Sequence, residues 1–160
     1  MDKDKFWQMI DDARNTAGRW QDMREPLLDS LAKLDAPDII RWKQIFDEYQ
    51  DLAYKDKLWA AAAAMLGGCS DDGFIDFRAW LTAQGKDVFM AALADPDSLA
   101  DVGAVQAFAQ EVRDSEGFTP LKGYQESASF EKLIYTPSDA YEQKTGGDDI
   151  YGPLYSSRLP

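Results

Sequence analysis

The side chains best suited to chemistry lie together between Gly67 and Trp80, in the segment GGCSDDGFIDFRAW. This segment contains the single cysteine of the chain together with a serine, three aspartates and an arginine. A thiolate is a nucleophile, and carboxylates transfer protons or bind Mg²⁺, so these residue types fit a small enzyme or a ligand-binding site. The candidate functional patch consists of Cys69, Ser70, Asp71, Asp72, Asp76 and Arg78.

A structural role for the same residues competes with the chemical one. Ser70 to Asp72 precede a helical pattern and are suited to capping it, which leaves Asp76 and Arg78 in water on the polar face of that helix. A helix N-terminus lowers the pKa of a nearby thiol, but the adjacent acids disfavour the thiolate, and a lone cysteine is more often a small buried apolar residue. The sequence therefore favours a role in folding for this patch and leaves a functional role open.

Metal and cofactor chemistry finds little support in the sequence. With Gly73 at the sixth position of a calcium loop, Gly68 and Ala79 fall where the first and last acidic ligands belong, so we expect no calcium there. The chain has no histidine, which excludes Ser-His-Asp and Cys-His catalysis and histidine-ligated metals. One cysteine cannot form a thiolate zinc or iron–sulfur site, and no glycine-rich phosphate loop is present. No cofactor and no metal are expected.

The charge of the chain points to the kind of partner it can bind. It has 17 basic and 29 acidic side chains, a formal net charge of −12. Such a field repels nucleic acid and anionic membrane surfaces, and it favours solubility and fast association with a basic protein. The longest apolar run, Leu58 to Leu66, is too short to span a bilayer, and no apolar signal core follows Met1. We expect a cytoplasmic protein whose oligomeric state stays open.

Trp20 is the one tryptophan that does not fall on a helical apolar stripe. It follows Gly18 in a polar linker beside Arg19, whereas the other four tryptophans fall mostly on such stripes and are expected in the core. Because tryptophan and arginine are enriched at binding hot spots, Trp20 is the candidate exposed contact.

Helical periodicity dominates the rest of the chain, and no run alternates as a strand does. The run from Leu58 to Leu66 is apolar nearly all round and is expected at the centre of a bundle. Residues 115–129 are expected to form a loop, and Thr136-Pro137 is a strong helix start. The predicted helices cover residues 6–17, 26–34, 36–53, 58–66, 74–81, 88–93, 99–112, 130–134 and 137–144.

These elements predict an all-α fold: a single-domain, compact helical bundle of about seven to nine helices with a flexible C-terminal tail. Residues 1–146 are expected to form the single helical domain. Residues 147–160 are expected to form the tail, which is mobile or docked loosely through Tyr151, Leu154 and Tyr155.

Several segments together resemble a known family. They are FWQMIDDAR at residues 6–14, the stretch at 58–101 with GGCSDDGF, FRAWL and DPDSLA, and the closing element at 131–146. The chain resembles the bacterial family called domain of unknown function 4240, which is common in actinomycetes. This resemblance implies no catalytic residues for the chain.

Two classes of function follow from these observations. The leading hypothesis is a non-enzymatic, acidic, cytoplasmic protein-binding domain, similar in profile to immunity or inhibitor proteins, that captures a basic partner. The alternative is a small ligand-binding domain or a carboxylate- or thiol-dependent enzyme with its site near Cys69 to Arg78. Self-association through an exposed apolar surface is a third possibility.

Overall fold

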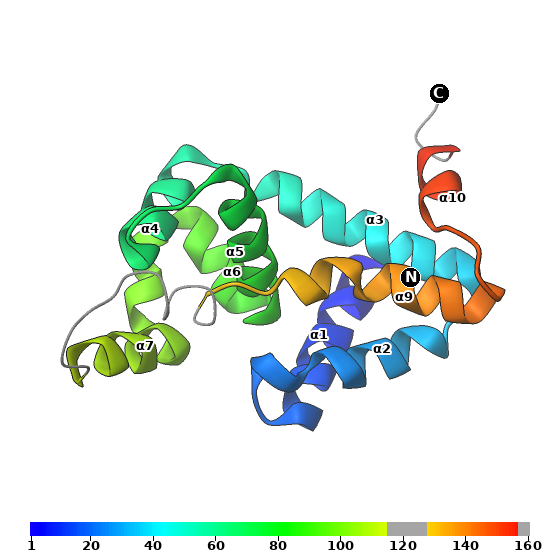
Figure 1. Ribbon diagram of the computed structural model, residues 1–160, viewed down its shortest axis with the longest axis horizontal. Coiled ribbons are helices and arrows are strands. Elements are labelled where there is room, and N and C mark those ends of the chain that lie inside the picture. The colour runs from blue at the N-terminus through cyan, green and yellow to red at the C-terminus, as the bar shows by residue number, and fades with distance from the viewer. Residues whose placement is uncertain (115–127, 157–160) are drawn as a thin grey trace. The chain divides into compact units, whose positions relative to one another are not determined.

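The computed structural model describes residues 1–114 and 128–156, with the side chains of residues 111–114 left aside (Figure 1). Within these residues all regular elements are helical, and eight of the α-helices have nine residues or more. The all-α fold class is confirmed. The elements are α1 (Lys3–Ala17), η1 (Trp20–Asp22), α2 (Arg24–Ala32), α3 (Ala36–Leu52), α4 (Asp56–Leu66), α5 (Asp71–Ala83), α6 (Lys86–Ala94), η2 (Pro96–Asp101), α7 (Gly103–Asp114), α9 (Glu131–Thr145) and α10 (Tyr151–Ser156).

The chain divides into two compact units by its contacts. Unit 1 comprises residues 1–51 and 132–160, and unit 2 comprises residues 52–131. Unit 1 therefore joins the first three α-helices to α9 and α10 from the end of the chain. The single domain expected over residues 1–146 stays a prediction, because a division by contacts does not define the unit that folds.

The core of unit 1 is built around aromatic side chains of α1 and α3. The Phe6 ring lies 4.8 Å from that of Trp42, and the Trp7 ring lies 4.9 Å from that of Tyr49, between centroids. All four side chains are buried. Rings at these separations pack closely and contribute beyond the area they bury, so this cluster fastens α1 to α3.

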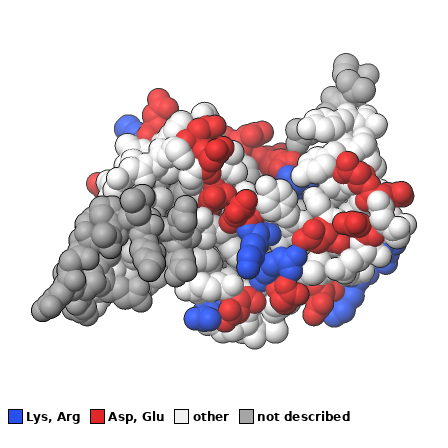
Figure 2. Space-filling model, viewed as in Figure 1, with Lys and Arg blue, Asp and Glu red and all other residues white. Residues whose placement is uncertain are grey.

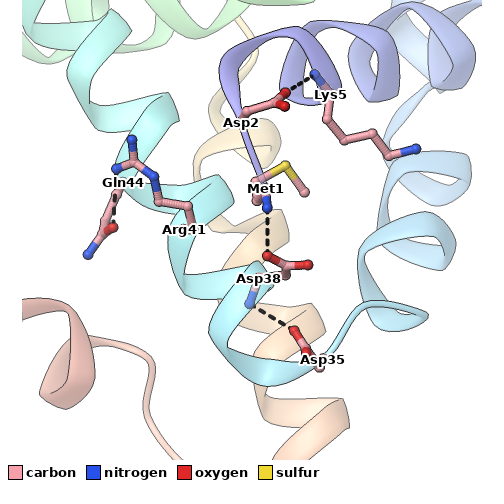
Figure 3. A network of polar contacts seen from close by, with 7 residues as sticks. All are labelled: Met1, Asp2, Lys5, Asp35, Asp38, Arg41 and Gln44. Atoms are coloured by element: carbon pink, nitrogen blue, oxygen red, sulfur yellow. Dashed lines mark hydrogen bonds and ion pairs between the residues drawn. The ribbon is translucent and has the colours of Figure 1, made fainter.

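Polar contacts fix the starts of α1 and α3, as Figure 3 shows. The Asp2 carboxylate accepts a hydrogen bond from the Lys5 backbone N–H at 2.8 Å, and Asp35 accepts one from the Asp38 N–H at 3.1 Å. The amino group of Met1 donates to Asp38 at 2.8 Å, which brings the two helix starts together. The Asp2 and Asp35 carboxylates cap the two helices, since each satisfies a free backbone donor of the first turn.

The predicted helix start at Thr136-Pro137 is wrong. α9 begins at Glu131 and runs through Pro137, although an internal proline removes a backbone hydrogen bond and costs about 3 kcal/mol. Packing outweighs this cost, because the buried residues recur at the spacing of a single helical face. The Thr136 hydroxyl also donates to the Lys132 carbonyl at 2.7 Å, just before the proline. The buried face consists of Leu133, Thr136, Pro137, Ala140 and Tyr141.

In unit 2 the burial expected of residues 58–66 is also wrong. α4 buries only Leu58 and Ala62, and its alanines at 60 and 64 are exposed. An apolar composition made mostly of alanine carries little surface to bury, so this helix packs by one face. The larger set of buried side chains in unit 2 belongs instead to α5, which buries eight of them, Trp80 among them.

The tail is described only in part. Ile150, just before α10, and Leu154 within it are buried, whereas Tyr151 and Tyr155 are exposed, so of the expected docking contacts Leu154 is confirmed and the two tyrosines are wrong. Residues 157–160 lie outside the described residues, as do residues 115–127 of the predicted loop.

Among the described residues, none of the helices combines the length and the apolar character needed to cross a membrane.

Candidate functional site

The first turn of α5 positions half of the predicted patch. The Ser70 hydroxyl accepts a hydrogen bond from the Gly73 backbone N–H at 3.1 Å, and Asp71 and Asp72 follow in the first turn, exposed to solvent. A serine at the N-cap satisfies one free donor of the helix, and acids in the first turn lie at the positive end of its dipole. The capping interpretation of Ser70 is confirmed.

Arg78 is not exposed on the polar face, as the capping interpretation expected. Its side chain is 7% exposed, and its guanidinium carbon lies 4.9 Å from the ring centroids of both Tyr54 and Phe74. Its Nε–H also donates to the Phe74 carbonyl oxygen at 3.2 Å. The two ring centroids are 5.8 Å apart, so the guanidinium packs against two adjoining rings, whose electron-rich faces stabilise a cation, and Arg78 serves as a packing residue here.

Aromatic side chains extend this packing to the loop before α5. The Trp59 ring stacks on Phe74 with 5.1 Å between centroids, and its indole N–H donates to the Cys69 carbonyl at 2.9 Å. The Tyr54 hydroxyl lies 3.4 Å from an oxygen of Asp71. Trp59 of α4 thus stacks on α5 and at the same time holds the backbone at Cys69.

Cys69 and Asp76 form the remaining part of the patch. Burial, and next the charge of Asp76, raise the pKa of the Cys69 thiol. Burial also raises the pKa of Asp76, followed by the charges of Glu131 and Asp72. Each group therefore favours its neutral form more than it does in water, which opposes a thiolate nucleophile at Cys69.

The six residues of the patch do not form one catalytic arrangement. Ser70 caps α5 and Arg78 packs against the Tyr54 and Phe74 rings, while burial, and then neighbouring carboxylates, raise the pKa values of Cys69 and Asp76. Over residues 1–114 and 128–156, no three histidine, cysteine or acidic residues are placed to hold a metal ion. The geometry accounts for these side chains by capping, packing and exposure.

Trp20 is buried, so its prediction as an exposed contact is wrong. Its side chain is 8% exposed, and the short helix η1 that carries it contacts both α1 and α2. The chain reverses at Gly18, whose φ of 79° ends α1 in the left-handed region. Because of this turn, the segment that carries Trp20 packs against α1 and α2, and the indole is buried there.

A groove between α2 and α9 of unit 1 was missed by the sequence reasoning. It consists of two hollows, of about 650 and 310 Å³, on either side of the ion pair between Arg24 and Asp139, whose atoms lie 2.6 Å apart. We call it the α2–α9 groove. Its α9 wall follows helical spacing, but its α2 wall comes from residues over a hundred positions away, so no local pattern reveals it. It is lined by Arg24, Glu25, Leu28, Lys132, Tyr135, Asp139, Glu142, Gln143, Gly146 and Gly147.

Acidic side chains are spread over the described part of the face drawn in Figure 2, with a small group of basic side chains among them. The ion pairs found in the described residues all lie within unit 1. Among the side chains that the structure describes, exposed acidic ones outnumber exposed basic ones, so this part of the surface is negatively charged.

Comparison with protein families gives one result. A family model described as a protein of unknown function (DUF4240) matches residues 1–143, which include the predicted patch and most of α9. The resemblance seen in the sequence is thereby confirmed. Comparison with curated proteins and with solved structures gives no match.

Proposed function

The chain belongs to the DUF4240 family of proteins of unknown function, so its role has to be argued from its own residues, and we propose that it is a non-enzymatic acidic protein that binds a basic partner protein. A cytoplasmic location and an inhibitor-like or immunity-like role are part of this proposal. It is carried by one observation: the exposed carboxylates of the described surface exceed the cations that could neutralise them.

The helix starts of unit 2 illustrate this excess. Aspartates in the first turns of α4, α5, α6 and η2 are exposed, and none of them takes part in an ion pair within the described residues. Each one suits the dipole of its own helix, yet together they project negative charge into the solvent. The residues are Asp56, Asp71, Asp72, Asp87 and Asp97.

A surface of this kind raises the rate at which a basic protein associates. Complementary charge steers the encounter of two proteins and fixes their orientation, and salt screens this effect. An enzymatic site at Cys69 to Arg78 finds less support, because the raised pKa of the Cys69 thiol disfavours its nucleophilic form and the buried Arg78 packs against aromatic rings.

The test is a capture experiment with a defined charge control. The purified chain is used as bait in lysate of its source organism at about 0.1 M and about 1 M NaCl, where the Debye length falls from about 10 to about 3 Å. Bound proteins are identified by mass spectrometry, and each is then purified and mixed with the chain to measure stoichiometry and affinity. A parallel bait carries Asp71→Asn, Asp72→Asn and Asp87→Asn.

The proposal expects a basic protein that binds the purified chain at low salt, binds less at high salt, and binds the triple variant more weakly. The triple variant has to keep the helical circular dichroism of the wild type for this comparison. The proposal is contradicted if no captured protein binds the purified chain. It is also contradicted if the partner is neutral or acidic and its affinity does not depend on salt.

A further inference from the structure

We propose that the larger hollow of the α2–α9 groove accepts an arginine or lysine side chain of the basic partner protein. This inference rests on the proposed function and adds the place and the chemistry of the contact. The hollow has a volume of about 650 Å³, opens to the solvent, and is lined by residues of unit 1.

The lining of this hollow offers acceptors for a cation. Glu142 is exposed and takes part in no ion pair among the described residues, and Gln143 beside it presents an amide oxygen. The one cation of the lining, Arg24, is already engaged by Glu25 and by Asp139. A guanidinium or ammonium group entering the hollow therefore meets a carboxylate that has no counter-charge of its own.

The end of α9 adds to the same preference. Gly146 and Gly147 line the hollow, and their backbone N–H groups both donate to the Glu142 carbonyl at 3.0 Å, which closes the helix. The C-terminal end of a helix carries partial negative charge and attracts cations within its last turn. A Cβ built on either glycine meets no atom within 4 Å, so the space beside this helix end is open.

The two hollows of the groove differ in charge, which selects the larger one. The smaller hollow is lined by Lys132 and by the exposed ring of Tyr135 in addition to the Arg24 pair. A cationic side chain is repelled from Lys132 and drawn towards Glu142, about 10 residues or 15 Å further along α9. Leu28 is buried at the wall of the larger hollow and offers apolar contact to the aliphatic stem of an arginine or lysine.

The test uses the full chain labelled with ¹⁵N and observed by two-dimensional NMR. The probe is N-acetyl-arginine-N-methylamide, and the matched probe is the citrulline analogue, which has the same shape without the charge. The inference expects the arginine probe to shift the amide signals of Gly146, Gly147 and the Gln143 side chain, and the citrulline probe to leave them nearly unmoved.

Two variants test the charge of the hollow. Glu142→Gln keeps the shape and removes the charge, and it is expected to weaken the binding of the arginine probe by about two- to fivefold, the range of an exposed ion pair. Asp12→Asn removes the same charge from the exposed face of α1, away from the hollow, and is expected to leave the dissociation constant unchanged. Equal effects of the two variants would overturn the inference.

The partner found by capture gives a second measurement. Glu142→Gln is expected to weaken its binding by more than Asp12→Asn does. If the partner binds the chain in a salt-dependent way but binds Glu142→Gln as tightly as the wild type, the assignment of the hollow is wrong while the proposed function stands. If the arginine probe binds at Gly146 and Gly147 but no basic protein can be reconstituted with the chain, the protein partner is wrong and the hollow serves a small cation instead.

Discussion

Replacement of Arg78 by lysine tests whether this residue is held as a planar cation against two adjoining aromatic rings. Lysine keeps the charge but cannot lie flat against Tyr54 and Phe74, and it loses the hydrogen bond from Nε to the Phe74 carbonyl. Each cation–π contact contributes about 1–2 kcal/mol when the cation is largely shielded from water, and the hydrogen bond about 1 kcal/mol. Because the ammonium keeps part of the attraction to the rings, Arg78→Lys is expected to destabilise the fold by about 1–2 kcal/mol.

A double-mutant cycle separates the ring contact from other effects of this substitution. Tyr54→Leu removes one ring, and in combination with Arg78→Lys it is expected to show a coupling energy of about 1 kcal/mol. Tyr54→Phe is the matched control, since it keeps the ring and removes only the hydroxyl that lies 3.4 Å from Asp71. This control is expected to change stability by less than about 0.5 kcal/mol.

The assay is equilibrium unfolding in urea followed by circular dichroism, with free energies obtained by linear extrapolation for all four members of the cycle. Non-additivity below about 0.3 kcal/mol, the usual scatter for independent sites, would refute the packing of Arg78 against the Tyr54 ring. An Arg78→Lys protein as stable as the wild type would refute it as well. A structural Arg78 also leaves the affinity for the basic partner unchanged, provided that the variant is folded in the binding assay.

Three further predictions concern the patch around α5. Ser70→Ala removes the cap of this helix and is expected to cost about 1 kcal/mol in urea unfolding, whereas Ser70→Asp, which keeps a capping oxygen, is expected to cost less. Cys69 is expected to react with iodoacetamide more slowly in the folded chain than in urea at the same pH, because burial, and next Asp76, raise the pKa of its thiol; equal rates would contradict this. Burial, then Glu131 and Asp72, raise the pKa of Asp76, so its ionised form destabilises the folded chain at neutral pH and this penalty is lost as the pH falls through the folded pKa. Asp76→Asn is therefore expected to be more stable than the wild type at pH 7, and the difference should shrink in acid; a constant difference across the titration would show that the charge of Asp76 is not its cause.

Local signals made most of the helices predictable from the sequence. Ser70 was identified as a cap because a short polar side chain before an apolar stripe has few other roles. Gly18 and Gly67 end α1 and α4, and both adopt the left-handed conformation that glycine tolerates best. These features depend on residues within a few positions of one another, which is the range that periodicity and capping rules cover.

Features set by tertiary packing were predicted less well. Pro137 suggested a helix start, but the buried face of α9 continues across it. Trp20 stood in a polar linker, yet the turn at Gly18 returns it to the core. Arg78 is buried because the Tyr54 ring, from the linker between α3 and α4, meets it beside Phe74 of its own helix, and the residues around Arg78 in the sequence do not indicate the contact with Tyr54. In each case a contact with another element outweighed a local preference.

The α2–α9 groove shows the same limit for the candidate site. Its walls are joined by Arg24 and Asp139, which are 115 positions apart in the chain. The sequence drew attention to Gly67 to Trp80 because unusual residue types gather there, and the structure explains most of them by capping and packing. A surface formed by two helices from opposite ends of the chain leaves no such signal.

The central claim, that the chain binds a basic protein through its acidic surface, is tested most directly by the association rate constant of the purified partner as a function of salt. The wild type is compared with Asp71→Asn/Asp72→Asn/Asp87→Asn by stopped-flow fluorescence between about 0.01 and 1 M NaCl, over which the Debye length falls from about 30 to 3 Å. The account predicts a rate constant that falls steeply with salt, a lower rate for the variant at low salt, and rates that converge at high salt. A rate constant independent of salt and equal in the two proteins would contradict it.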